Sequence, residues 1–178
     1  MKQYERSLRR TIDAGQLDDA NVCQWANTLF LGLDQLHGSG LVVRDIKPEN
    51  ILLDWHGKSV LSNFGISALL GTRSIVESSI KGTFNYMAQE AFELGPINLP
   101  RDIWSMAYVV VEMCTGNIPW KDMQMQQIMR TVCDHRRVPD VPDAAPAADM
   151  LRRCFAFEKA WRPTAGQMVS SMRQMHSA

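Results

Sequence analysis

Apolar residues recur most regularly in two long stretches, and both predict helices. Across residues 17–36 they return every three or four positions, which is typical of a helix with one buried face. Asp18 and Asp19 are suited to cap the start of this helix, and Gly38-Ser39-Gly40 ends it. Across residues 101–114 nearly every side is apolar, so we expect a helix buried over its whole circumference.

Shorter apolar runs predict strands on either side of a charged loop. Residues 41–43 and 51–53 are rich in branched side chains, and each is interpreted as a short buried strand. A turn at residues 54–57 joins the second run to residues 59–62, which predicts a small hairpin. Further helices are expected at residues 123–133, 147–157 and 164–175.

Two features of these helices admit more than one interpretation. His37 ends the first helix, where the helix dipole favours a basic residue, so a structural role is preferred to ligand binding. Met123, Met125 and Met129 lie in the expected helix at 123–133. They would form either an adaptable docking face or gap-filling core, and the core interpretation is preferred.

The loop between the first two strands carries Arg44, Asp45, Lys47, Glu49 and Asn50. A carboxylate can accept a hydroxyl proton, an ammonium group two residues later can neutralise phosphate charge, and an amide five residues later can ligate a hard cation. Together these groups are suited to phosphoryl transfer. The alternative is a charged surface turn without chemistry.

This loop resembles the catalytic loop of protein kinases, His-Arg-Asp followed by four residues and Asn, with Val43 where the family usually has His or Tyr. The resemblance implies that Asp45 accepts the proton of a substrate hydroxyl and that Lys47 offsets charge on the transferred group. It also implies that Asn50 binds magnesium and that Leu52 packs beneath the adenine of ATP.

Asn63-Phe64-Gly65 follows the hairpin and resembles the metal-binding Asp-Phe-Gly of protein kinases, with Asn63 in place of the aspartate. A neutral amide offers one oxygen and no charge, so magnesium is expected to bind less well. Without the N-terminal lobe, which forms half of the nucleotide clamp in kinases, both ATP and magnesium are expected to bind weakly. Phe64 is expected to stack with Val43 in the interior beneath the site.

Residues 66–81 show no sustained periodicity and are interpreted as a mobile segment. In kinases this is the activation segment, where a phosphate added by an upstream activating kinase would pair with Arg44. Thr83, in the pair Gly82-Thr83, resembles the substrate-positioning residue of serine/threonine kinases. Ala88-Gln89-Glu90 resembles the Ala-Pro-Glu that ends the segment.

Two charged residues are expected to support the site. Asp102 stands at the start of a buried helix, so it must accept hydrogen bonds; the resemblance implies that it holds the backbone of the catalytic loop. Simple N-capping of the helix is the alternative, and Asp102 could fill both roles at once. Arg162 resembles the kinase arginine that pairs with Glu90.

Charge, cysteine spacing and apolar content limit the classes of partner, bound metal and cellular location to be expected. The 178 residues contain 19 Lys plus Arg and 19 Asp plus Glu, which gives no electrostatic case for nucleic acid or an anionic membrane. Four cysteines stand far apart, so neither a zinc site nor a disulfide framework is indicated. The N-terminus has no signal-like core, and the longest apolar run is too short to span a bilayer. We therefore expect a soluble cytoplasmic protein.

The resemblance covers residues 1–178 as one domain, the helical C-terminal lobe of a protein kinase, without the N-terminal lobe that clamps ATP. The expected fold is mainly α within an α+β family, with a small β-hairpin around the catalytic loop. The function implied is a serine/threonine protein kinase domain acting on a protein substrate, partial and weakened by Asn63. The alternatives are a pseudokinase that serves as a binding or scaffold module and an unrelated helical interaction domain.

Overall fold

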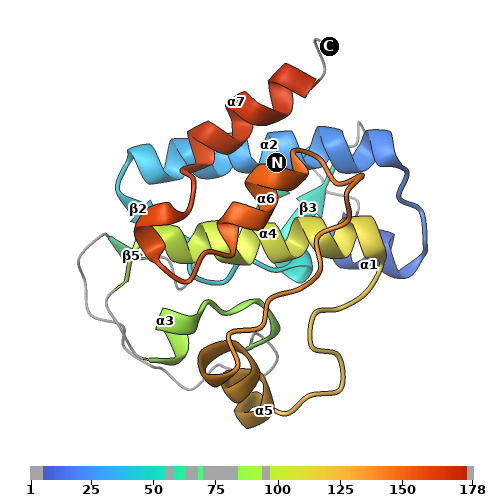
Figure 1. Cartoon of the computed structure of the whole chain (residues 1–178). Helices are drawn as coiled ribbons and strands as arrows, with labels where there is room; N and C mark the ends of the chain where they lie inside the picture. Colours follow the sequence, from blue (N-terminus) through green and yellow to red (C-terminus); the bar gives the residue numbers. More distant parts are fainter. Residues whose placement is uncertain (1–5, 55–57, 63–67, 70–83, 94–96, 176–178) are drawn as a thin grey trace.

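Two long helices form the centre of the molecule. The computed structural model describes residues 6–54, 58–62, 68–69, 84–93 and 97–175. Helix α2 (Asp19–Gly38) and helix α4 (Leu99–Thr115) lie at the centre of the fold (Figure 1). The side chain of Asp18 caps α2 by accepting a hydrogen bond of 2.7 Å from the amide of Asn21, as the sequence predicts.

Helix α4 is the buried helix that the apolar pattern predicts. Every residue from 101 to 113 is buried. The helix ends at Gly116, whose φ of 68° is a left-handed conformation that glycine adopts without steric cost. Trp104 in this helix packs edge-on against Phe155 and Phe157, with ring centroids 5.4 and 5.6 Å apart. The core therefore joins α4 to the C-terminal part of the chain.

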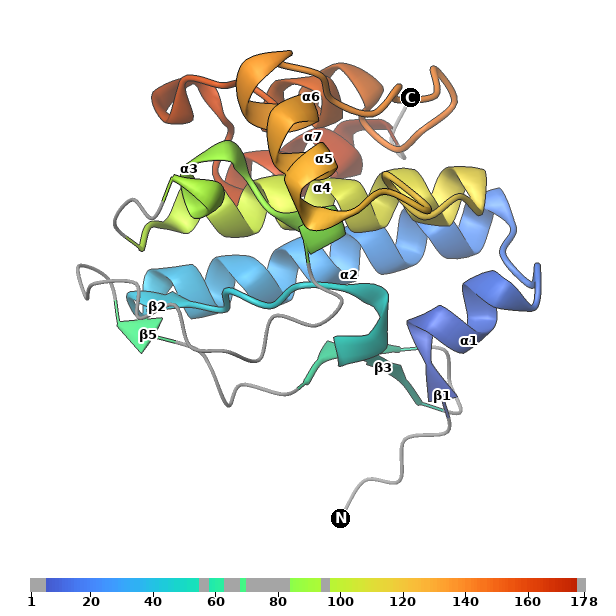
Figure 2. The same ribbon diagram turned by 90° about the horizontal axis from the view of Figure 1, so that it is seen from below.

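The C-terminal helices cover one side of this pair, and the strands lie on the other. Helix α7 (Ala165–Met175) packs along α2, and α6 (Ala148–Cys154) packs against α4. Figure 2 shows the strands on the side of α2 away from α6 and α7. The loop between β2 (Leu41–Val42) and β3 (Ile51–Leu53) therefore lies against the two central helices, α2 and α4.

The strands form two small antiparallel sheets. One has the order β1 (Arg6–Ser7), β3 (Ile51–Leu53) and β4 (Ser59–Leu61), and the other pairs β2 (Leu41–Val42) with β5 (Ala68–Leu69). In the first sheet Leu52 lies opposite both Ser7 and Val60. The predicted hairpin is therefore confirmed as β3–β4, whereas the two-residue strands β1 and β5 were not predicted.

Short helical segments complete the described chain. They are α1 (Leu8–Asp13), α3 (Gln89–Phe92), α5 (Met125–Met129), the 3-10 turns η1 (Pro48–Asn50), η3 (Phe84–Tyr86) and η5 (Lys159–Trp161), and the π-helical turn η4 (Arg130–Asp134). In the described part of the chain, no helix combines the length and apolarity needed to cross a membrane. The helices confirm the mainly α fold expected from the sequence.

The interpretation of the methionine-rich segment as core was wrong. Met123, Met125 and Met129 are 42%, 41% and 38% exposed. Helix α5 has only five residues and buries Ile128 alone, so its methionines face solvent.

Candidate active site

The charged loop leaves β2 and passes through η1 into β3. Val43 and Ile46 are buried, 2% and 1% exposed, and fix the loop to the core at two points. Between them Arg44 has a φ of 74°, a left-handed backbone conformation that is strained for a residue other than glycine. Such strain costs on the order of 1–3 kcal/mol and persists only where the surrounding structure enforces it.

Asp102 provides that enforcement. Its Oδ2 accepts a hydrogen bond of 2.8 Å from the amide of Val43, and its Oδ1 accepts one of 2.9 Å from the amide of Arg44. The carboxylate is buried in α4, so these amides satisfy a group that would otherwise be costly to bury. The hydrogen bonds expected between Asp102 and the backbone of the catalytic loop are therefore present.

The alternative interpretation, that Asp102 caps α4, is wrong. The helix begins earlier than residue 101, and its N-cap is Asn98, whose side chain accepts a hydrogen bond from the amide of Arg101. His37 lies in the last turn of α2, and its Nε2 is 3.0 Å from Asp102 Oδ2. A side chain from a third element therefore also contacts this carboxylate.

Asp45, Lys47 and Asn50 come together within the loop. Lys47 Nζ lies 2.9 Å from Asp45 Oδ2. Asn50 Nδ2 donates to the same oxygen at 2.8 Å and to the carbonyl of Asp45 at 2.9 Å. The side chain of Asp45 is only 13% exposed, so these hydrogen bonds hold the carboxylate in a fixed orientation.

The second carboxylate oxygen of Asp45, Oδ1, is buried and has no hydrogen-bond partner in the described part of the chain. A buried acceptor left without a donor is costly, and such groups are found where a ligand supplies the missing donor. A substrate hydroxyl is a suitable donor for this oxygen. The carboxylate, amide and ammonium groups of the loop therefore fit a magnesium–nucleotide complex and an alcohol in chemical type.

The backbone ties Asn50 to the strand that precedes Asn63. The carbonyl of Asn50 accepts hydrogen bonds of 2.8 Å from both the amide and the hydroxyl of Ser62. Leu52, the residue expected beneath the adenine, is half-buried on β3. Asn63, Phe64 and Thr83 lie outside the described residues, so their predicted roles stay predictions.

No group of three His, Cys, Asp or Glu side chains within the described ranges is arranged to hold a metal ion. The predicted magnesium ligands are instead the amides of Asn50 and Asn63.

The predicted ion pair between Glu90 and Arg162 is present and buried. Arg162 Nη1 and Nη2 donate to the two carboxylate oxygens of Glu90 at 2.7 and 3.0 Å. The arginine side chain is 0% exposed and the glutamate side chain 7%. Arg162 also donates to the carbonyls of Ala156 and Pro100, and its guanidinium lies 4.8 Å from the ring centroid of Trp104.

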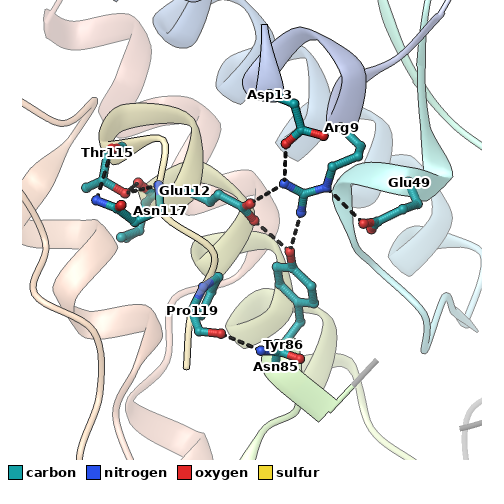
Figure 3. Close-up of polar contacts among 10 residues, drawn as sticks. Arg9, Asp13, Glu49, Asn85, Tyr86, Glu112, Thr115, Asn117 and Pro119 are labelled. Carbon is teal, nitrogen blue, oxygen red and sulfur yellow. Dashed lines mark hydrogen bonds and ion pairs between the residues drawn. The ribbon is translucent and has the colours of Figure 1, made fainter. Parts of the chain in front are cut away.

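Sequence reasoning missed a second charged network, shown in Figure 3. Arg9 Nη1 donates to Glu112 at 2.6 Å, Nη2 donates to the hydroxyl of Tyr86 at 2.8 Å, and Nε donates to Glu49 at 2.9 Å. Tyr86 in turn donates to Glu112 at 2.6 Å. The one available signal was Glu112, a carboxylate in an otherwise apolar helix.

Burial governs the protonation of this network. It raises the pKa of Glu112, although hydrogen bonds from Arg9 and Tyr86 offset part of the rise. It also raises the pKa of Tyr86, and the negative charge of Glu112 adds to this. Burial alone would lower the pKa of Arg9, but its hydrogen bonds to Glu112 and Glu49, together with the negative charge of Glu112, raise it. Arg9 therefore stays charged and Tyr86 stays neutral at ordinary pH.

Comparison with known proteins decides the family. The sequence matches the protein kinase domain over residues 2–172, a range that includes the charged loop, Asp102 and Arg162. The chain belongs to the protein kinase family. This kinase chain is 33% identical over 169 residues to mitogen-activated protein kinase kinase kinase 1 of Arabidopsis thaliana, covering 92% of this chain and 27% of the relative.

Two further relatives from Arabidopsis thaliana are similar. Mitogen-activated protein kinase kinase kinase YODA is 33% identical over 87% of this chain and 18% of its own length. Mitogen-activated protein kinase kinase kinase 3 is 33% identical over 92% of this chain and 30% of its own length. The chain thus spans a third or less of the length of these relatives. The fold and family expected from the sequence are confirmed.

Proposed function

We propose that residues 1–178 form the helical lobe of a serine/threonine protein kinase domain that transfers the γ-phosphate of ATP to protein hydroxyls. The observation that carries this proposal is the unequal hydrogen bonding of the two carboxylate oxygens of Asp45. Its Oδ2 is held by Lys47 and Asn50, while its buried Oδ1 lacks a hydrogen-bond partner in the described part of the chain. That arrangement suits an acceptor for the proton of an alcohol.

The other loop residues have separate roles in this proposal. Lys47 offsets charge on the transferred group, and Asn50 and Asn63 hold magnesium. Asp102 keeps Arg44 in its strained conformation and so fixes the direction of Asp45. When bound, ATP would supply the phosphoryl group, and its magnesium ion would supply positive charge to offset the negative charge on the phosphates. Leu52 contacts the adenine, and Thr83 positions the substrate.

The position of Asn63 predicts a weakened reaction. Magnesium prefers charged oxygen ligands, and an amide supplies a single neutral oxygen. We therefore expect slow transfer and weak binding of both ATP and magnesium. The substrate proposed is a protein, and the names of the relatives favour one that is itself a protein kinase.

A pseudokinase is the second candidate, and Asn63 is the residue that favours it. In that case the domain would act by binding other signalling proteins, without phosphate transfer. The two functions differ in their response to Asn63→Asp. A kinase weakened by this residue gains magnesium affinity and activity, whereas a scaffold gains neither.

The direct test joins residues 1–178 to the nucleotide-clamping lobe of a related kinase and measures transfer of radiolabelled phosphate from magnesium–ATP to a generic protein substrate. We expect transfer above the level of Asp45→Ala. The matched control is Asp140→Ala, which removes an exposed carboxylate outside the loop and should leave transfer unchanged. Equal signals from the unaltered protein and Asp45→Ala would contradict the proposal.

A further inference from the structure

Arg9 joins four segments that are far apart in the sequence. Its guanidinium contacts Asp13 in α1, Glu49 in η1, Tyr86 in η3 and Glu112 in α4 (Figure 3). Hydrogen bonds to charged groups are the strongest of their kind, and a planar guanidinium fixes its partners in direction as well as distance. One side chain thus links η1 to η3.

Turns η1 and η3 contain or follow residues with a proposed role in phosphate transfer. Glu49 immediately precedes Asn50, and Tyr86 follows Thr83 by three residues. Main-chain hydrogen bonds close each turn: in η1 the amide of Asn50 donates to Lys47 O at 3.0 Å and the amide of Ile51 donates to Pro48 O, and in η3 the amide of Met87 donates to Phe84 O at 3.1 Å. Short 3-10 turns have poor hydrogen-bond geometry, so their position depends on contacts with other elements.

The buried end of the network keeps Arg9 in place. The side chain of Glu112 is 0% exposed and that of Arg9 14% exposed. Within the described part of the chain, withdrawing the guanidinium would leave the buried carboxylate of Glu112 with the hydroxyl of Tyr86 as its one remaining hydrogen-bond donor, which is unfavourable. The contact to Glu49 is made by Nε of the same guanidinium, and this partner is 48% exposed. Glu112 therefore anchors Arg9, and Arg9 in turn restrains Glu49 and Tyr86.

We propose that Arg9 is a positioning residue, through which helix α1 holds two turns in a fixed relation: η1, which contains Asn50, and η3, which follows Thr83 in the sequence. The expected effect of Arg9 on the rate of phosphate transfer rests on the proposed function, but its expected effect on the order of the two turns does not. The competing role is simple compensation of the charge on Glu112, which would stabilise the fold as a whole without ordering the two turns in particular.

Amide hydrogen exchange of the full chain separates these roles without any activity measurement. The reporters are the amides of Asn50 and Met87, and the reference is the amide of Met168 in α7, which donates to Thr164 O at 3.1 Å. We expect Arg9→Ala to speed exchange at both reporters by about tenfold or more, with no change at the reference. Equal acceleration at all three amides, or none, would overturn the proposal.

Three further variants sharpen the result. Arg10→Ala removes the neighbouring exposed arginine and should change none of the three amides. Arg9→Lys retains the charge without the fork and should restore protection in part. Glu49→Ala leaves the buried contacts intact, so it tests the idea even if Arg9→Ala does not fold. It should accelerate Asn50 alone, and an unchanged Asn50 amide in this variant would also refute the inference.

The catalytic arm uses the chimera with a nucleotide-clamping lobe. Arg9→Ala should lower kcat about tenfold while the KM for ATP stays within twofold, because positioning acts on the loop rather than on nucleotide affinity. If the unaltered protein transfers no phosphate, the proposed function fails and the exchange measurement still decides the role of Arg9. If transfer occurs and exchange at both reporters is unaffected, the positioning role fails and the kinase function stands.

Discussion

Replacing Arg162 by alanine should destabilise the protein by about 3–5 kcal/mol, because it breaks a buried ion pair from one side. The structure sets this magnitude: Glu90 would keep a carboxylate that is 7% exposed and would lose both hydrogen bonds, of 2.7 and 3.0 Å, from the guanidinium. The carbonyls of Ala156 and Pro100 would each lose a donor as well.

Urea unfolding followed by tryptophan fluorescence measures this loss. For m of roughly 2 kcal/mol/M, a loss of about 4 kcal/mol lowers the midpoint by about 2 M. The matched control is Arg152→Ala, since Arg152 pairs with Asp143 and Asp149 at the surface and is itself 42% exposed. That change should cost less than about 1 kcal/mol.

Two additional variants identify the cause. Arg162→Lys keeps the charge but loses the paired hydrogen bonds, so its loss should be intermediate. The double change Glu90→Leu with Arg162→Met removes both charges and should be less damaging than Arg162→Ala alone. Equal midpoints for Arg162→Ala and Arg152→Ala would refute the reasoning. A double variant as unstable as the single one would show that packing, rather than an unpaired charge, is responsible.

Three other predictions test separate parts of the structure. Asp102→Ala should lower the thermal midpoint, since the amides of Val43 and Arg44 each lose an acceptor worth about 1–3 kcal/mol; an unchanged melt would contradict this. Burial raises the pKa of the Cys154 thiol to about 12 from an ordinary value of 9.0, so the folded state holds this proton more tightly and the contribution of Cys154 to stability should fall as pH rises from 9 to 12. Melting of Cys154→Ala over that range should show a weaker pH dependence than the unaltered protein, and parallel curves would count against the burial argument. Met129→Lys should change stability by no more than about 0.5 kcal/mol because Met129 faces solvent, whereas Met168→Lys should prevent folding; comparable losses in urea unfolding would mean that Met129 is core after all.

Periodicity was sufficient to predict the long helices and the hairpin. The stripe that includes Val22, Leu29 and Leu33 is buried in α2, and residues 101–113 are buried on all sides of α4. Strands β1 and β5 have two residues each, too few to show an alternating pattern. The methionines of α5 were misassigned because hydrophobic character alone does not tell whether a short helix has a partner on each face.

Site prediction succeeded where residues are close in sequence or match a family pattern. Asp45, Lys47 and Asn50 lie within six positions, and Asp102 and Glu90–Arg162 were expected from the kinase resemblance. The contacts of Arg9 span 40, 77 and 103 residues to Glu49, Tyr86 and Glu112. No local pattern encodes such pairs, because they depend on how α1 packs against η1 and α4. Asn98 was missed as the cap of α4 because Leu99 and Pro100 separate it from the apolar run.

The most direct test of the central claim is the phosphate-transfer rate of Asn63→Asp, measured in the chimera with and without Asp45→Ala. Restoring the carboxylate should raise the rate about tenfold or more, since it adds a charged ligand for magnesium. The gain should disappear when Asp45 is removed. A rate that does not rise in Asn63→Asp, or a gain that survives Asp45→Ala, would contradict the assignment of this loop as a phosphoryl-transfer site.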